Sequence, residues 1–267
     1  MINEKIYLDE NDPDVVLETF AHVDPLMPKR DAILVLPGGA YCHLASFREG
    51  ECVACAFASR GVNAFVLSYR LGPKNNYPCQ LIDAVRAMVY IKENAEKYGI
   101  DADRVFAVGF SAGGHLLGTL ATKYMIGEEL LSLPKDSARP AGTIYSYPVI
   151  SAYAPHVGSF ENLLGKPFFE LTKEEKDFHS VDLNVTENTP PAFIWHTAED
   201  NAVPPEGALS LAAAYVSKKV KVEMHLYPYG PHGIALATPH TSNGNVGFVQ
   251  PRAEEWVDKA VSFMKTV

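Results

Sequence analysis

Short, continuous apolar runs alternate with segments of helical spacing along almost the whole chain. The runs that we predict as strands lie at residues 33–36, 64–67, 105–108, 143–150, 192–196 and 222–227. Predicted helices lie at 47–60, 79–98, from 113 to about 124, 205–217 and 252–265. Strands that are apolar on both faces are typical of parallel sheets covered by helices. The sequence therefore predicts an α/β fold with a mostly parallel central sheet and helices on both faces.

The chain length fits one domain, residues 1–267, because 267 residues with 47% hydrophobic side chains can bury a core without disulfides or metals. Residues 151–190 interrupt the alternation. They are polar and contain a Lys-Glu-Glu-Lys run at 173–176. Two interpretations stay open for this insert: a surface excursion with a solvated helix face, or a small lid over a site.

The charge balance disfavours some classes of partner. The chain has 23 Lys+Arg against 32 Asp+Glu, a net charge of −9, which disfavours nucleic acids and anionic membranes. The acidic first residues lack the basic start and apolar core of a signal peptide. No apolar run approaches the ~18 residues of a membrane span. We therefore expect a cytoplasmic protein with no membrane or nucleic-acid partner; the sequence is compatible with a monomer or a homodimer.

The cysteines do not indicate a metal or redox site. The four are Cys42, Cys52, Cys55 and Cys79, and they form one C-x-x-C pair, at 52–55, with no second pair at zinc-site spacing. That pair falls inside an apolar helical pattern, which favours packed thiols. We predict no metal and no cofactor.

A nucleophile motif lies at residues 109–113. The sequence Gly109-Phe110-Ser111-Ala112-Gly113 matches G-x-S-x-G and lies directly between a predicted strand and a predicted helix. This setting is typical of a nucleophile elbow, whose tight turn needs small flanking residues and presents the serine hydroxyl at the carboxyl end of the sheet. We therefore predict Ser111 as a catalytic nucleophile, with an ordinary tight turn as the alternative.

A serine nucleophile needs a base, and the base needs a carboxylate that orients it. After a nucleophile elbow, the acid precedes the histidine in the chain. His232 lies in a loop directly after the last predicted strand, at the sheet edge where ligands gather. We predict His232 as the base, with His240 as the alternative. The other candidates after Ser111 lie in predicted helices, strands or the insert: His115, His156, His179, His196 and His225.

The acid is expected in the loop after the strand at 192–196. Asp200 and Glu199 both lie there, and Asp200 is further out, just before the chain turns toward a helix. We predict Asp200 as the acid, with Glu199 as the competitor.

Acyl transfer also needs N–H donors aimed at the developing oxyanion. The N–H of Ala112 is one source, and the glycine-containing loop at 36–41 is a second. Tyr41 and Phe110 are candidates for packing against substrate near this site.

Taken together, these motifs resemble the α/β-hydrolase superfamily. More narrowly, they resemble the small bacterial esterases and lipases that include acetyl-xylan and feruloyl esterases and lie near the hormone-sensitive-lipase-like carboxylesterases. The resemblance extends from about residue 32 to residue 263. Its marks lie at residues 36–41, 69–73, 83–84, 109–115, 158–165, 190–203 and 231–233.

The resemblance implies an α/β-hydrolase fold and a set of roles: Ser111 as nucleophile, Asp200 as acid, His232 as base, and Gly39, Ala40 and Ala112 as oxyanion donors. Related lipases usually carry His-Gly-Gly-Gly where this chain has Pro37-Gly38-Gly39-Ala40. The backbone donors survive that change, but any contribution from the histidine side chain does not.

The combined prediction is a serine carboxylic-ester hydrolase that works through an acyl-enzyme without a cofactor. By the resemblance, its substrate is a small-molecule ester with a short acyl group, such as the acetyl esters of xylo-oligosaccharides. Two alternatives remain: an amide hydrolase (a formamidase or peptidase) on the same triad, and an inactive ligand-binding protein on the same fold.

Overall fold

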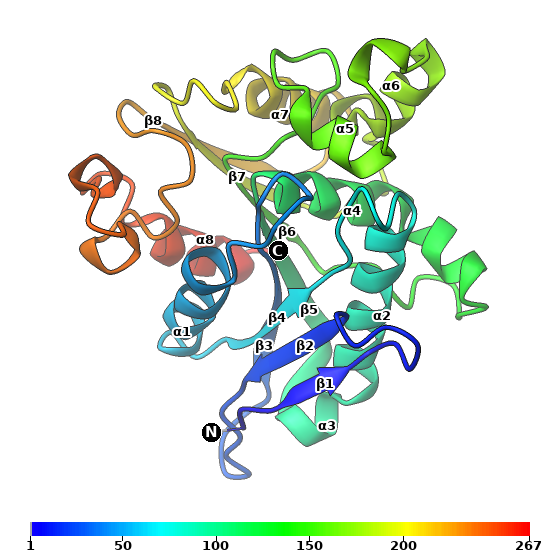
Figure 1. The fold of residues 1–267 in the computed structure, drawn as a ribbon. Coiled ribbons are helices and arrows are strands. Elements are labelled where there is room, and N and C mark those ends of the chain that lie inside the picture. Colours follow the sequence, from blue (N-terminus) through cyan, green and yellow to red (C-terminus); the bar gives the residue numbers. More distant parts are fainter. Residues whose placement is uncertain (1) are drawn as a thin grey trace.

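A central sheet of eight strands runs through the computed structural model, which describes residues 2–267 (Figure 1). The strands are β1 (Lys5–Tyr7), β2 (Val16–Phe20), β3 (Arg30–Leu36), β4 (Asn63–Ser68), β5 (Ile100–Phe110), β6 (Thr143–Ser146), β7 (Ala192–Thr197) and β8 (Val222–Tyr227). Their order is β1-β2-β4-β3-β5-β6-β7-β8. All pairs from β4 to β8 are parallel, whereas β1 and β2 add an antiparallel edge.

The inner strands are apolar because both of their faces are covered. Residues 32–36 of β3 and 105–110 of β5 are fully buried, and so are residues 192–196 of β7. In a parallel sheet, helical crossovers must cover both faces, so these strands have no polar face. The predicted parallel sheet with helices on both faces is confirmed.

Eight α-helices surround the sheet in the part of the chain that the structure describes: α1 (Cys52–Ala58), α2 (Cys79–Glu93), α3 (Ala95–Tyr98), α4 (Ala112–Leu130), α5 (Gly158–Leu164), α6 (Lys173–His179), α7 (Glu206–Ser217) and α8 (Trp256–Met264). Figure 1 shows α1 and α8 together on one face, with α2, α3 and α4 on the other. Two separate apolar clusters match this division, one joining α1 and α8 and the other joining α2, α4 and α7.

Several boundaries differ from the predictions. The strands β1 and β2 were not predicted, and β6 ends at Ser146 rather than near residue 150. The predicted helix at 47–60 begins as a π-helical turn, η1 (Ser46–Glu51), before α1. The predicted helix at 79–98 is divided at Asn94, whose φ and ψ of −101° and 23° are not helical. Gly99 ends it at φ 61°, a conformation that glycine adopts without a Cβ penalty.

The insert, residues 151–190, packs against the rest of the domain. It carries α5 and α6 and the short turns η2 (Phe168–Glu170) and η3 (Val181–Asn184). Val181 N–H donates to the Ile150 carbonyl at 2.9 Å, and His115 Nε2 in α4 lies 2.8 Å from the His179 carbonyl. Figure 1 shows α5 and α6 above α4. The insert is therefore tied at several points to the body that carries the site.

No helix within residues 2–267 combines the length and the apolar character needed to cross a membrane.

Candidate active site

Four parallel strands end at the same edge of the sheet, and the loop after each carries one predicted part of the site. β3 ends at Leu36, β5 at Phe110, β7 at Thr197 and β8 at Tyr227. The glycine-containing loop, Ser111, Asp200 and His232 follow these ends in that order. Parallel strands place their carboxyl ends together, so loops more than a hundred residues apart in the chain meet there.

The turn at Ser111 is as tight as the motif predicts. Ser111 has φ 51° and ψ −118°, a region that L-residues rarely adopt. A Cβ added to Gly109 would lie 2.3 Å from the Gly113 carbonyl oxygen, and one added to Gly113 would lie 2.1 Å from that of Leu36. Only glycine therefore fits at both flanks, and the turn places the Ser111 side chain at the start of α4.

The structure brings Ser111, His232 and Asp200 into one hydrogen-bonded chain. Ser111 Oγ lies 2.8 Å from His232 Nε2, and His232 Nδ1 lies 2.6 Å from Asp200 Oδ2. With the His232 proton on Nδ1, that N–H donates to the carboxylate and Nε2 accepts from the serine hydroxyl. This is the arrangement in which an imidazole can remove the hydroxyl proton.

The Asp200 carboxylate is buried and fully hydrogen-bonded. Its Oδ1 accepts from the Ala202 N–H at 3.0 Å and the Val203 N–H at 2.9 Å. His196 Nε2 lies 3.2 Å from Oδ2, in addition to His232. Burial by itself raises the pKa of the Asp200 carboxyl. Hydrogen bonds from His196 and His232, the charge that His232 can carry and the Val203 N–H outweigh burial and hold this pKa well below its usual range.

His196 is a second imidazole on the Asp200 carboxylate, although its position within a predicted strand indicated only a packed residue. Its Nε2 also lies 2.9 Å from the Val203 carbonyl oxygen. A carbonyl can only accept, so Nε2 must carry the ring proton and must donate toward Asp200 as well. The spacing of four residues between His196 and Asp200, across the end of a strand, was the signal available in the sequence.

The N–H groups of Gly39 and Ala40, in the glycine-containing loop, have no hydrogen-bond acceptor in the described chain. Their orientation is fixed by the carbonyls of the same two peptide units, which accept hydrogen bonds. The Gly38 carbonyl accepts from Ala45 N–H at 3.0 Å, and the Gly39 carbonyl accepts from the N–H groups of Cys42 and His43. A trans peptide points its N–H opposite to its carbonyl. The N–H groups of Gly39 and Ala40 therefore point away from these contacts, and neither donates to an acceptor within residues 2–267.

The N–H of Gly38, in the same loop, is not available to a substrate. Gly38 N–H donates at 2.8 Å to the carboxylate of Glu49, which is buried. Asn162 of α5 donates from Nδ2 to the Ala40 carbonyl at 2.8 Å, so the insert also holds the loop. Neither Glu49 nor Asn162 was identified from the sequence as a site residue, because each reaches the loop only through the tertiary fold.

Tyr41 and Phe110 do not lie where the sequence analysis expected. Both side chains are buried, with 1% and 0% of their surface exposed. The Tyr41 hydroxyl donates to His115 Nδ1 at 2.8 Å, and the Phe110 ring packs against Tyr147 and Trp256. The prediction that they contact substrate is therefore corrected: they support the loops from beneath, within the core.

The insert also contacts the loop that carries the acid. His156 Nδ1 donates to the Ala202 carbonyl at 3.0 Å, and His156 Nε2 accepts from the Ser159 hydroxyl at 2.8 Å. Burial lowers the pKa of His156, and the nearby His232 lowers it further. A small apolar cluster joins the two segments, formed by Val149, Ala152, Phe160, Leu171 and Val203.

The alternative base and acid lie outside the hydrogen-bonded chain. His240 packs its ring edge-on against Phe47 at 6.0 Å between centroids. Glu199 accepts from the Gly230 N–H at 3.2 Å, and its carboxylate forms no hydrogen bond with Ser111 or His232. The geometry therefore brings together Ser111, His232 and Asp200, the residues that the sequence pattern favours.

The cysteines are free thiols, as predicted, but only one of the C-x-x-C pair is packed. Cys52 is buried, whereas Cys55 is exposed, so the expectation of packing is wrong for Cys55. Burial raises the pKa of the Cys52 thiol, and partial desolvation together with the charge of Glu51 raises that of Cys55, which disfavours the reactive thiolate at both positions. Within residues 2–267, no group of three or more His, Cys, Asp or Glu side chains is arranged to hold a metal ion.

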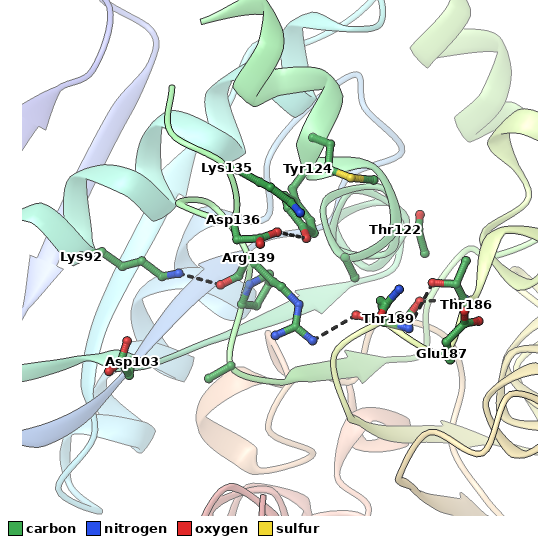
Figure 2. A pocket seen from close by; sticks show the side chains of 15 residues that line it. Lys92, Asp103, Thr122, Tyr124, Lys135, Asp136, Arg139, Thr186, Glu187 and Thr189 are labelled. Atoms are coloured by element: carbon green, nitrogen blue, oxygen red, sulfur yellow. Dashed lines mark hydrogen bonds between the residues drawn. The ribbon is translucent and has the colours of Figure 1, made fainter. Parts of the chain in front are cut away.

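A cavity of about 720 Å³ lies away from the triad, between α4 and the loops at 131–141 and 186–189 (Figure 2). Its polar groups largely bond to one another. Lys92 Nζ donates to the Arg139 carbonyl at 2.7 Å, Arg139 Nη2 donates to the Asn188 carbonyl at 3.0 Å, and the Tyr124 hydroxyl donates to Asp136 at 2.6 Å. We assign no chemistry to this cavity.

Comparison with known proteins identifies similar chains. The model of the family described as BD-FAE matches residues 26–215. Endo-1,4-beta-xylanase B of Butyrivibrio fibrisolvens is 40% identical over 233 residues, which are 85% of this chain and 36% of that protein. The chain spans only 36%, 43% and 54% of three curated relatives that it matches.

Solved structures cover nearly the full length. MGS-M1, an alpha/beta hydrolase from a Medee basin deep-sea metagenome library, is 30% identical with a TM-score of 0.80, covering 100% of this chain and 97% of that one. The acetyl ester-xyloside bifunctional hydrolase from Caldicellulosiruptor lactoaceticus is 31% identical with a TM-score of 0.79, covering 97% and 96%. The predicted α/β-hydrolase fold is confirmed by this similarity.

Proposed function

The chain belongs to the BD-FAE family, and on that basis we propose that it is a serine esterase that hydrolyses short-chain carboxylic esters, with acetylated xylo-oligosaccharides as its substrate class. The observation that carries this proposal is the hydrogen-bonded chain from Ser111 through His232 to Asp200. The names of two similar proteins, a xylanase and an acetyl ester-xyloside hydrolase, support the substrate class.

In the acylation step, Ser111 Oγ attacks the carbonyl carbon of the ester while its proton passes to His232 Nε2. Asp200 accepts the His232 Nδ1–H throughout and stabilises the imidazolium that forms. The oxyanion receives hydrogen bonds from the N–H of Ala112 and from those of Gly39 and Ala40. When the tetrahedral intermediate collapses, the ester C–O bond breaks and the imidazolium protonates the leaving alcohol.

In the deacylation step, water takes the place of the alcohol. His232 Nε2 removes a proton from water, and the hydroxyl oxygen attacks the carbonyl carbon of the acyl-Ser111 ester. The same N–H groups hold the second oxyanion. Its collapse breaks the bond to Ser111 Oγ, which recovers its proton from His232 and leaves the carboxylic acid as product. No cofactor takes part in these steps.

The preference for short acyl groups rests on how the insert uses its apolar residues. Phe160 and Leu171 are buried in the small cluster with Val203, and Phe169 is exposed to solvent. This leaves few apolar side chains of the insert to form the walls of a long acyl tunnel. An added methylene gains about 0.8 kcal/mol only where it can be buried. Acetyl and propionyl esters should therefore be hydrolysed faster than octanoyl and longer ones.

A fluorophosphonate probe and an ester panel test the proposal. We expect the probe to label the protein and not Ser111→Ala, and kcat/KM for p-nitrophenyl esters of two to twelve carbons to peak at two or three. Faster release of acetate from acetylated xylo-oligosaccharides than from acetylated simple alcohols would support the sugar substrate. A maximum at eight carbons or beyond would contradict the short-chain preference.

The same experiment separates the alternatives. Labelling with turnover of anilides but not esters would indicate an amide hydrolase. A protein that is folded but not labelled would be an inactive binding protein on this fold.

A further inference from the structure

Glu49 is a buried carboxylate that the mechanism above does not use. It lies in the π-helical turn η1, and only 5% of its surface is exposed. Burying a carboxylate is costly unless it is hydrogen-bonded. Glu49 has no cationic side chain within salt-bridge distance in the described chain, so its two donors, the Gly38 N–H and the Tyr147 hydroxyl, must offset that cost.

These two donors belong to different parts of the site. Gly38 begins the loop that carries the free N–H groups of Gly39 and Ala40, and its N–H lies 2.8 Å from Glu49 Oε2. Tyr147 is the residue directly after β6, and its hydroxyl donates to Glu49 Oε1 at 2.8 Å. The same hydroxyl accepts from the Ala235 N–H at 3.0 Å, three residues beyond His232.

Tyr147 also contacts the catalytic imidazole directly. Its ring lies edge-on to His232 with 5.1 Å between centroids. The neighbouring residue of η1 reaches the same loop, because Arg48 donates to the carbonyls of Gly233 and Thr241. One turn of π-helix therefore contacts both the loop that faces the oxyanion and the loop that carries the base. Such turns occur frequently at functional sites.

We propose that Glu49 is a positioning residue for the reaction, whose carboxylate couples the Gly38–Ala40 loop to the His232 loop through the Tyr147 hydroxyl. Gly38 has little freedom of its own here, since a Cβ on it would lie 2.7 Å from Glu49 Oε2 and 2.9 Å from the Ser111 Cβ. A shift of the carboxylate would move this loop relative to the nucleophile. The inference rests on the proposed function, because positioning matters only if Ser111 is acylated.

The charge of Glu49 acts in two opposing directions. A negative charge behind the loop disfavours the developing oxyanion, yet it favours the imidazolium that forms on His232 at the same moment. To separate the two effects, variants are needed that change the hydrogen bonds of Glu49 with and without removing its charge. Tyr147→Phe keeps the charge and removes the bridging hydroxyl. Glu49→Gln removes the charge but keeps an acceptor oxygen for the Gly38 N–H, and Glu49→Met removes both.

The experiment measures kcat and KM for p-nitrophenyl acetate, the rate of Ser111 labelling by a fluorophosphonate, and inhibition by phenylboronic acid, which mimics the tetrahedral intermediate. We expect Tyr147→Phe and Glu49→Met each to lower kcat and the labelling rate about tenfold, less than the ~10²–10³ for direct loss of an oxyanion donor. KM should change less than threefold, and boronate affinity should fall in parallel with kcat. Glu49→Gln should stay within threefold of wild type. The double variant Tyr147→Phe/Glu49→Met should be no slower than the slower single variant.

Glu128 supplies a matched control. It is also a buried glutamate that accepts from backbone N–H groups, those of Asp136 and Ala138, and from a hydroxyl, that of Ser137. Glu128→Met should lose comparable stability in a urea titration and leave kcat and labelling unchanged.

Two results would overturn the positioning role. One is that Tyr147→Phe and Glu49→Met keep kcat and labelling within twofold of wild type while losing stability as Glu128→Met does. The other is that their effects multiply in the double variant, since independent sites give additive free energies. A wild-type protein that is labelled but hydrolyses no ester would refute the proposed substrate. The role of Glu49 would then be judged from the labelling rates of the variants alone. A wild type that is not labelled refutes both proposals.

Discussion

Replacing Asp200 by asparagine tests the triad, because it should change which nitrogen of His232 carries the ring proton. The carboxylate faces four donors: the N–H groups of Ala202 and Val203 on Oδ1, and those of His196 and His232 on Oδ2. An amide can offer only one oxygen. With its NH2 group toward the two backbone N–H groups, it would leave both without an acceptor, at about 1–3 kcal/mol each.

The amide oxygen of Asp200→Asn should therefore take the Oδ1 position, with its NH2 group toward the imidazoles. His196 Nε2–H keeps the Val203 carbonyl as an acceptor, so the loss of stability should be small. His232 Nδ1 must then accept rather than donate, which moves the ring proton to Nε2, the nitrogen that should receive the Ser111 proton. Loss of the productive tautomer lowers kcat by ~10³–10⁴ in a serine triad, or about 4–5.5 kcal/mol.

The assay is kcat/KM for p-nitrophenyl acetate beside a urea titration. Glu199→Gln is the matched control, because Glu199 is the adjacent carboxylate and its side chain accepts a hydrogen bond from the Gly230 N–H rather than from an imidazole. We expect it to stay within about threefold of wild type. More than a tenth of wild-type activity in Asp200→Asn, or a larger loss in Glu199→Gln, would refute the assignment of the acid.

The remaining predictions concern other parts of the site and the core. Ser111→Ala should lower kcat by ~10⁴ or more without loss of thermal stability; activity above a tenth of wild type would exclude it as nucleophile. Asn162→Ala frees the Ala40 carbonyl and should lower kcat about three- to tenfold at nearly constant KM, and unchanged kcat would show that the insert does not hold this loop. Burial lowers the pKa of His115 from 6.5 to about 4, so only the unfolded chain gains this proton between those pH values. The contribution of His115 to the free energy of unfolding should fall by about 3 kcal/mol as the pH drops through that range, so urea titrations of His115→Gln should show a shallower fall than those of the wild type. Burial also lowers the pKa of Lys123 to about 8, so Lys123→Met should raise the free energy of unfolding at pH 7 by roughly 1–3 kcal/mol; an unchanged urea midpoint would contradict this.

Much of the architecture followed from local patterns. The apolar runs at 33–36, 105–108 and 192–196 predicted inner strands because a strand covered on both faces has no polar side. Since parallel strands end at one edge, the loops after them could be expected to meet there. Together with the G-x-S-x-G motif, that reasoning predicts Ser111, Asp200 and His232 as the residues that meet at this edge.

Other elements lacked a clear local signal. The strand β2 has only five residues, Val-Leu-Glu-Thr-Phe, which do not alternate between apolar and polar, and β1 has three. Their place in the sheet depends on the pairing of β2 with β4 and of β1 with β2. The side chains of Tyr41 and Phe110 lie next to site residues in the sequence but turn into the core. Adjacency along the chain does not determine which way a side chain points.

The sequence by itself determined which residues could carry the chemistry, because the elbow and the loops after parallel strands are local features. Only the tertiary structure decided how they are held. Glu49 meets Tyr147 across 98 residues and Asn162 meets the Ala40 carbonyl across 122, with no local motif to mark either contact. It also decided which N–H groups of the glycine-containing loop stay without an acceptor, because Glu49 occupies that of Gly38. A buried hydrogen bond depends on where two distant segments pack, and that position is set by the whole core rather than by the residues on either side.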